Sequence, residues 1–143
     1  MKINVVLDQG AKMPVKAHEI DAGFDLYSPA EFTVNPATNR GAGTAIINTG
    51  VHMQIPVGYV GFIKSKSGLN VKHGLTAEGV IDSGYTGSIV VKLYNYSDEE
   101  YKIHAGDKIT QLVILPIPPV ELEQVTELPE TERGSNGFGS SGR

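Results

Sequence analysis

Apolar and polar residues alternate with a period of two along much of the chain. In the segment 51–55 the odd positions are apolar, whereas His52 and Gln54 point to the opposite side, as in a strand with one buried face. Three further segments rich in β-branched and aromatic residues also predict strands, at 59–63, 88–94 and 109–115.

Turn-forming residues separate these segments, and no dozen consecutive residues carry apolar side chains at helical spacing. The chain contains 17 glycines and 8 prolines, and turn signals lie at 35–36, 39–41, 56–58, 97–98 and 105–107. We therefore predict an all-β fold built from many short strands, of the sandwich, barrel or jelly-roll type.

The composition fits one soluble domain. A length of 143 residues with 40% hydrophobic residues allows a packed core, and a net charge of −4 gives no general reason to expect nucleic acid or membrane as a partner. The absence of cysteine excludes disulfides and zinc–thiolate sites. Because residues 1–8 are too short an apolar run for a signal peptide and no later run reaches transmembrane length, we expect a cytoplasmic protein.

The C-terminal stretch differs from the rest. Residues 129–143 contain one aromatic side chain, Phe138, in a Gly/Ser-rich run that Arg133 opens. Such a tail is usually a flexible terminus, but glycine N–H groups, an arginine and an isolated aromatic ring can also close over a nucleotide. We divide the chain into a β domain at 1–128 and a flexible lid at 129–143.

Two polar side chains stand out near apolar strand positions. Gln111 lies within the predicted strand 109–115, where it either bonds to neighbouring backbone or points into a polar site. Asp82 follows an apolar pair in the segment 78–87, and Tyr85 lies across a tight Ser-Gly turn. This carboxylate is either an ordinary turn residue or a group that orients and deprotonates water. Scattered histidines and the lack of a nucleophile motif give no support to covalent catalysis.

Five segments, taken in order, resemble the five motifs of trimeric dUTP pyrophosphatases. They read Asp-Ala-Gly-Phe-Asp-Leu-Tyr-Ser (21–28), Ser-Lys-Ser-Gly-Leu (65–69), Glu-Gly-Val-Ile-Asp-Ser-Gly-Tyr-Thr-Gly (78–87), Gly-Asp-Lys-Ile-Thr-Gln-Leu (106–112) and Arg-Gly-Ser-Asn-Gly-Phe-Gly-Ser-Ser-Gly (133–142). The resemblance implies a jelly-roll-like β subunit that forms a homotrimer with active sites at subunit interfaces. It also implies Mg²⁺-assisted hydrolysis of dUTP to dUMP and pyrophosphate, which keeps uracil out of DNA and supplies dUMP for dTMP synthesis.

The same resemblance implies roles for residues near the base and sugar. Asp82 would activate the water that attacks the α-phosphate, and the backbone around Val80 and Ile81 would read uracil. Tyr85 would pack under the deoxyribose and leave no room for a 2′-hydroxyl. Thr76 stands where many members carry an asparagine that binds uracil.

The resemblance further implies a phosphate-binding region. Lys66, Ser67 and Gly68 would contact the phosphates. Asp25 and Gln111 would bind waters around the phosphates and around Mg²⁺, which the triphosphate itself would mainly hold.

The tail would close over the nucleotide. By resemblance, Phe138 would stack on uracil, Arg133 would bind the γ-phosphate, and Gly139, Ser140 and Ser141 would follow the phosphate chain.

The chain departs from the family pattern at four positions, and two other functions stay open. Ser65 and Lys66 replace a Pro-Arg pair, Lys108 replaces an arginine, and Thr76 replaces the asparagine. One alternative is a dCTP deaminase of the same fold, for which Glu78 is the nearby candidate base. The other is a nucleotide-binding regulator that no longer turns over its ligand.

Overall fold

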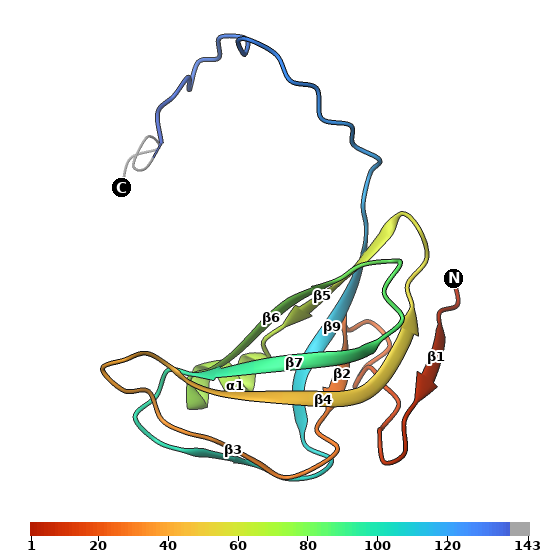
Figure 1. The fold of residues 1–143 in the computed structure, drawn as a ribbon, viewed down its shortest axis with the longest axis vertical. Helices are drawn as coiled ribbons and strands as arrows, with labels where there is room; N and C mark the ends of the chain where they lie inside the picture. Colours follow the sequence, from red (N-terminus) through yellow and green to blue (C-terminus); the bar gives the residue numbers. More distant parts are fainter. Residues whose placement is uncertain (138–143) are drawn as a thin grey trace.

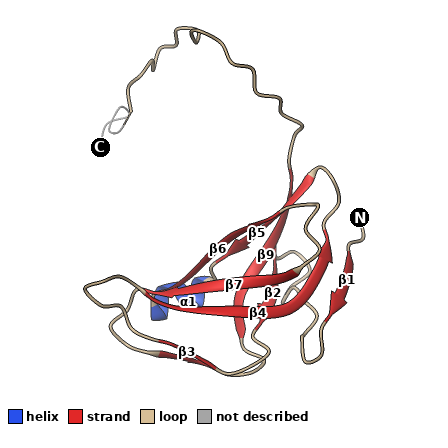
Figure 2. Ribbon diagram, viewed as in Figure 1, coloured by secondary structure: helices blue, strands red, loops and turns tan. Residues whose placement is uncertain are grey.

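The computed structural model describes residues 1–137, and their regular structure is almost entirely β (Figure 2). The strands are β1 (Asn4–Leu7), β2 (Gly23–Tyr27), β3 (Phe32–Val34), β4 (Gly43–Gln54), β5 (Tyr59–Lys64), β6 (Leu75–Ile81), β7 (Ser88–Asn95), β8 (Tyr101–Ile103) and β9 (Lys108–Pro116), with one helix, α1 (Ser67–His73). The predicted strands at 51–55, 59–63, 88–94 and 109–115 correspond to the end of β4 and to β5, β7 and β9, which confirms them.

Seven of the strands form one sheet in the order β1-β4-β7-β6-β5-β9-β2, and β3 pairs with β8 in a second, small sheet. All of these pairs are antiparallel. Figure 1 shows the large sheet curling around the core, with β3 along one side and α1 beside β6 and β7. This arrangement confirms the prediction of an all-β, jelly-roll-like fold.

The core is built from alternate positions of the strands, as the period-two pattern predicts. Val51 is 1% exposed, and Met53 and Ile55 are also buried, whereas His52 and Gln54 are not. The largest fully buried side chains are Leu26, Ile47, Ile55, Ile63, Leu75, Ile89, Leu93, Ile103, Ile109 and Leu112. Burying such side chains is the main favourable contribution to folding.

Helix α1 was not expected from the sequence. None of its residues is buried, so it carries no apolar stripe that could reveal helical spacing. Its end is set by Gly74, whose φ of 65° is the left-handed conformation that glycine adopts at little cost. The Gly74 N–H donates to the Asn70 carbonyl at 2.9 Å.

The chain leaves the sheet after β9. Residues 117–137 contain no helix or strand and are exposed, and they run away from the sheet (Figure 1). The Ile117 N–H still donates to the Gly58 carbonyl at 2.8 Å, which holds the first residue after β9 against the loop before β5. Within residues 1–137, no helix has the length and apolar character needed to cross a membrane.

Candidate functional site

The hairpin predicted around Asp82 is present, and its two strands diverge before the turn. The ladder between β6 and β7 runs from the Leu75–Asn95 pair to the Ala77–Leu93 pair. Beyond that point, residues 78–81 of β6 pair with β5, and the start of β7 pairs with β4. The edge of residues 78–81 that faces β7 is therefore free of ladder partners, so its backbone N–H and C=O groups are available to a ligand.

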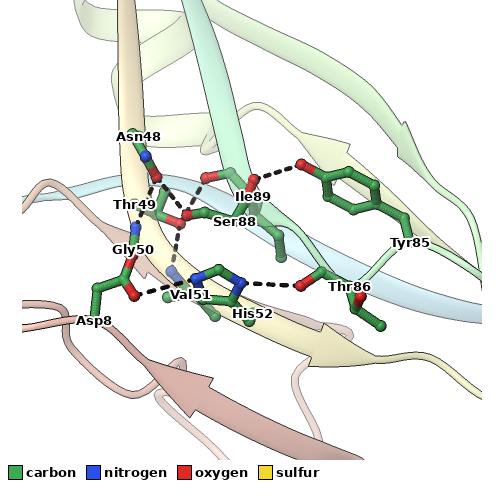
Figure 3. Close-up of polar contacts among 10 residues, drawn as sticks. All are labelled: Asp8, Asn48, Thr49, Gly50, Val51, His52, Tyr85, Thr86, Ser88 and Ile89. Atoms are coloured by element: carbon green, nitrogen blue, oxygen red, sulfur yellow. Dashed lines mark hydrogen bonds and ion pairs between the residues drawn. The ribbon is translucent and has the colours of Figure 1, made fainter.

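The turn at residues 82–87 presents a carboxylate and an aromatic ring. Asp82 is exposed, and its carbonyl accepts a hydrogen bond from the Tyr85 N–H at 3.0 Å. The Tyr85 hydroxyl donates to the Ser88 carbonyl at 2.8 Å, which folds the ring back along the turn (Figure 3). A Cβ on Gly87 would lie 2.5 Å from that hydroxyl, so this tyrosine position requires glycine at 87.

A second group of polar residues lies around Asp25 in β2. Its side chain is buried, with one carboxylate oxygen 2.5 Å from Lys66 Nζ and the other 2.7 Å from Lys108 Nζ. Burial alone raises the pKa of Asp25, but the hydrogen bonds and positive charges of Lys108 and Lys66 outweigh it and hold this pKa below its ordinary value. The hydrogen bond and negative charge of Asp25 in turn raise the pKa of Lys108. We call Asp25, Lys66 and Lys108 the Asp25 cluster.

Gln111, in β9, is the cross-strand partner of Asp25 in β2 and is half-buried. Its Nε2 donates to the Ser65 carbonyl at 3.0 Å. A hydrogen bond to the backbone is one of the two possibilities that the sequence allows for this amide. A Cβ on Gly23 would lie 2.6 Å from Gln111 Oε1, so Gly23 makes the space in which this amide lies.

A hollow of about 710 Å³ opens beside this region, between the start of α1 and the strands β6 and β7. Its lining includes two of the predicted site residues, Ser67 and Thr76, together with Ser65, Asn70, Glu78, Tyr94 and Tyr96. Gly68 follows Ser67 in α1 and is exposed. The Glu78 side chain is 80% exposed and lies 3.7 Å from Lys64 Nζ. An exposed, ion-paired carboxylate is a poor match for the buried base that a deaminase would need.

Within one chain, the turn and the Asp25 cluster lie apart. Ile81 pairs with Gly61 at the start of β5, so Asp82 lies next to Val60, whereas Lys66 follows the far end of that strand. Lys66 is six residue steps along extended chain from Val60, which is about 20 Å. For the same reason Thr76, at the beginning of β6, is about 20 Å along that strand from Asp82.

One member of the Asp25 cluster could not be identified from the sequence. The sequence shows Lys108 only as a replacement for arginine, because its contact with Asp25 depends on the pairing of β2 with β9. In the tail, Arg133 Nε donates to the Asn136 carbonyl at 3.1 Å, a local contact. Phe138, Gly139, Ser140 and Ser141 lie outside the described residues.

Metal ligands do not gather in the described part of the chain, where no three His, Cys, Asp or Glu side chains form a group that could hold an ion. Both oxygens of Asp25 are occupied by lysines. A cation here would have to bring most of its own ligands, as Mg²⁺ does when phosphate oxygens and waters surround it.

Comparisons with known proteins agree on one family. The family model described as dUTPase matches residues 9–142. A deoxyuridine 5′-triphosphate nucleotidohydrolase of Clostridium novyi (strain NT) is 44% identical over 138 residues, covering 94% of each chain. The protein of that name from Mus musculus is 38% identical over 140 residues, covering 97% of this chain and 83% of its own.

Solved structures lead to the same family. A mutant of the Staphylococcus bacteriophage 80alpha dUTPase with dUpNHpp has a TM-score of 0.88 and 34% identity, covering 99% of both chains. A mutant dUTPase of the S. aureus phage phi11, described with a structural Mg(II) ion, has a TM-score of 0.79 and 33% identity, covering 89% of this chain and 98% of its own.

Proposed function

The chain belongs to the dUTPase family, and from this premise we propose that it hydrolyses dUTP to dUMP and pyrophosphate. A water molecule attacks the α-phosphorus, the bond to the bridging oxygen of the β-phosphate breaks, and pyrophosphate leaves. Asp82 accepts the proton of that water. The product would supply dTMP synthesis, and removal of dUTP would keep uracil out of DNA. Location in the cytoplasm stays a prediction.

The observation that carries this proposal is that strands β6 and β7 diverge before the turn at 82–87. The free backbone edge near Val80 and Ile81 offers fixed donors and acceptors to the edge of a uracil base. Asp82 stands at the end of that edge, where a carboxylate can orient water, and Tyr85 supplies a face for the deoxyribose. Base recognition would rest mainly on this backbone, and a contribution of Thr76, at the beginning of β6, stays a prediction.

Phosphate binding is assigned to the end of β5 and the start of α1. Lys66, Ser67 and Gly68 would contact the phosphates, with Lys66 held in place by Asp25. Asp25 and Gln111 would bind the waters around the phosphates. Mg²⁺, held mainly by the triphosphate, would neutralise the charge that develops on the phosphate oxygens.

The distance between the two regions supports a site shared between protomers. Asp82 and Lys66 are about 20 Å apart along β5, whereas the sugar and the phosphates of one nucleotide are close neighbours. We propose that the turn of one protomer meets the Asp25 cluster of another in a homotrimer. The tail at 129–143 would then close over the nucleotide, with Arg133 at the γ-phosphate, Phe138 on the base, and Gly139 and Ser140 along the phosphates, and would exclude bulk water.

The test is pyrophosphate release from dUTP, dCTP, dTTP and UTP, with and without Mg²⁺. We expect turnover of dUTP that depends on Mg²⁺ and little turnover of the other three. Rapid hydrolysis of UTP would remove the proposed role of Tyr85. Release of ammonia from dCTP would favour the deaminase, and binding of dUTP without turnover would favour the regulator.

A further inference from the structure

The turn that carries Asp82 and Tyr85 is connected to the neighbouring strands through a histidine. His52, in β4, has Nδ1 2.9 Å from the carbonyl oxygen of Thr86, the residue that follows Tyr85 (Figure 3). Its Nε2 lies 3.2 Å from Oδ1 of Asp8, which follows β1. The two hydrogen bonds of Tyr85 stay within the turn and its first strand residue. His52 therefore connects the turn to two other strands.

The side chain is aimed at the turn by an irregularity in β4. The register between β4 and β7 shifts between Asn48 and His52, and Gly50 there has a φ of 69°. The Gly50 N–H donates to Asn48 Oδ1 at 3.0 Å, and the Thr49 hydroxyl donates to the Ile89 carbonyl at 2.7 Å. A bulge of this kind bends a strand and redirects its side chains.

The partners of His52 favour its protonated form. A carbonyl oxygen and a carboxylate accept hydrogen bonds, so the ring can donate to both only as the imidazolium. The hydrogen bond to the Thr86 carbonyl, and then the hydrogen bond and charge of Asp8, raise the pKa of His52 above its ordinary value. A neutral ring can keep only one of the two bonds.

We propose that His52 is a positioning residue of the dUTPase reaction, and that its doubly protonated ring holds the turn at 82–87 where Asp82 and Tyr85 act. The proposal rests on the proposed function of that turn. His52 touches neither of those two residues through its ring bonds, and it acts through the Thr86 carbonyl.

The inference also implies a pH dependence. Asp8 is the titratable group in contact with His52, and Asp82 and Tyr85 lie in the attached turn. Strands β1 and β4 carry no other titratable side chain, and Lys92 and Tyr94 lie further along β7. As the pH rises through the raised pKa of His52, the ring loses a donor and the turn loosens. The efficiency kcat/KM should therefore decline on the alkaline side of that pKa.

The experiment compares His52→Ala, His52→Gln and His104→Gln with the unchanged protein. His104 is a matched control, because it is an exposed histidine 3.5 Å from the carboxylate of Asp107 in a different turn. Steady-state hydrolysis of dUTP is measured from mildly acidic to alkaline pH, and hydrogen exchange is measured for the peptide that covers 82–88.

We expect His52→Ala to lower kcat/KM about tenfold and to speed exchange in the turn. His52→Gln, whose amide can still donate to the Thr86 carbonyl, should recover most of the activity without the alkaline decline. His104→Gln should match the unchanged protein. Unchanged kcat/KM, pH profile and exchange in His52→Ala would overturn the proposal.

A second measurement keeps the inference testable if His52→Ala does not fold. Asp8→Asn removes the carboxylate and should lower the pKa of His52, followed by NMR titration of its imidazole; an unchanged pKa would also overturn the proposal. If the unchanged protein fails to hydrolyse dUTP, the proposed function is wrong, whereas the exchange and NMR data still decide whether His52 holds the turn.

Discussion

The Asp25 cluster and the turn at 82–87 both present carboxylates, but in opposite environments. Asp25 is 4% exposed and has a lysine on each oxygen. Asp82 is exposed, and its neighbour Tyr85 is 44% exposed. The first carboxylate is fully partnered within one chain, whereas the second is open to a ligand.

The difference has a physical reason. A buried charge is tolerated only when it is paired, so the Asp25 cluster must form as the protomer folds. An exposed carboxylate needs no partner within the protomer. One region is therefore organised by folding, and in the proposed function the other is completed by subunit association and nucleotide binding.

The largest expected effect comes from the turn. Asp82→Asn keeps the shape of the side chain but removes the base, and we expect kcat to fall by about a thousandfold or more while binding of dUpNHpp is largely kept. Turnover and calorimetric binding are measured together. Asp98→Asn, a change at an exposed aspartate of another turn, should leave both unchanged. Near-normal turnover of Asp82→Asn would refute the role of Asp82.

Mixed trimers test whether the turn and the lid of one active site come from different protomers. Truncation after Glu130 removes the lid and should leave a folded trimer with turnover about a hundredfold lower. When that truncated chain and Asp82→Asn are unfolded and refolded together, some sites should combine an intact turn with an intact lid. Activity should then exceed the sum of the two separate preparations. No gain in verified mixed trimers would show that one chain supplies both.

The Asp25 cluster should dominate stability instead. Asp25→Asn leaves two lysines without their shared partner, and we expect a loss of about 2–4 kcal/mol in the free energy of unfolding. Because the pKa of Asp25 is lowered in the folded state, its contribution is present above the ordinary carboxyl pKa and is lost as the pH falls through the lowered value. The unchanged protein should therefore weaken below about pH 4, and Asp25→Asn should weaken less over that range. Urea unfolding at equal protomer concentration measures both, and identical acid dependence would contradict the expectation.

The smallest effect is expected at the lysine that joins the cluster to the phosphates. Lys66→Arg supplies a guanidinium that can donate two hydrogen bonds to one phosphate. We therefore expect KM for dUTP to fall by a factor of about 2–5 with kcat nearly unchanged. Lys64→Arg is the control, because Lys64 lies nearby on the exposed end of β5 and pairs with Glu78. Equal effects of the two substitutions would show that Lys66 acts only through its charge on the surface.

Much of the strand pattern could be predicted from local sequence. The alternation at 51–55 gave the buried and outward faces correctly, and the residues around Ser83 and Gly84 indicated the turn. Helix α1 could not be predicted, because a helix without a buried residue leaves no periodic signal.

The sequence by itself determined the fold class, the family and the residue types available for the chemistry, because alternation and motif order are properties of neighbouring positions. Only the tertiary structure decided which charges meet. Strand register brings together residues that lie far apart in sequence. Examples are the ion pairs of Asp25 with Lys66 and Lys108 and the hydrogen bond between His52 and the Thr86 carbonyl. The same register separates Asp82 from Lys66 along β5, which is the basis for proposing a site shared between copies of the chain.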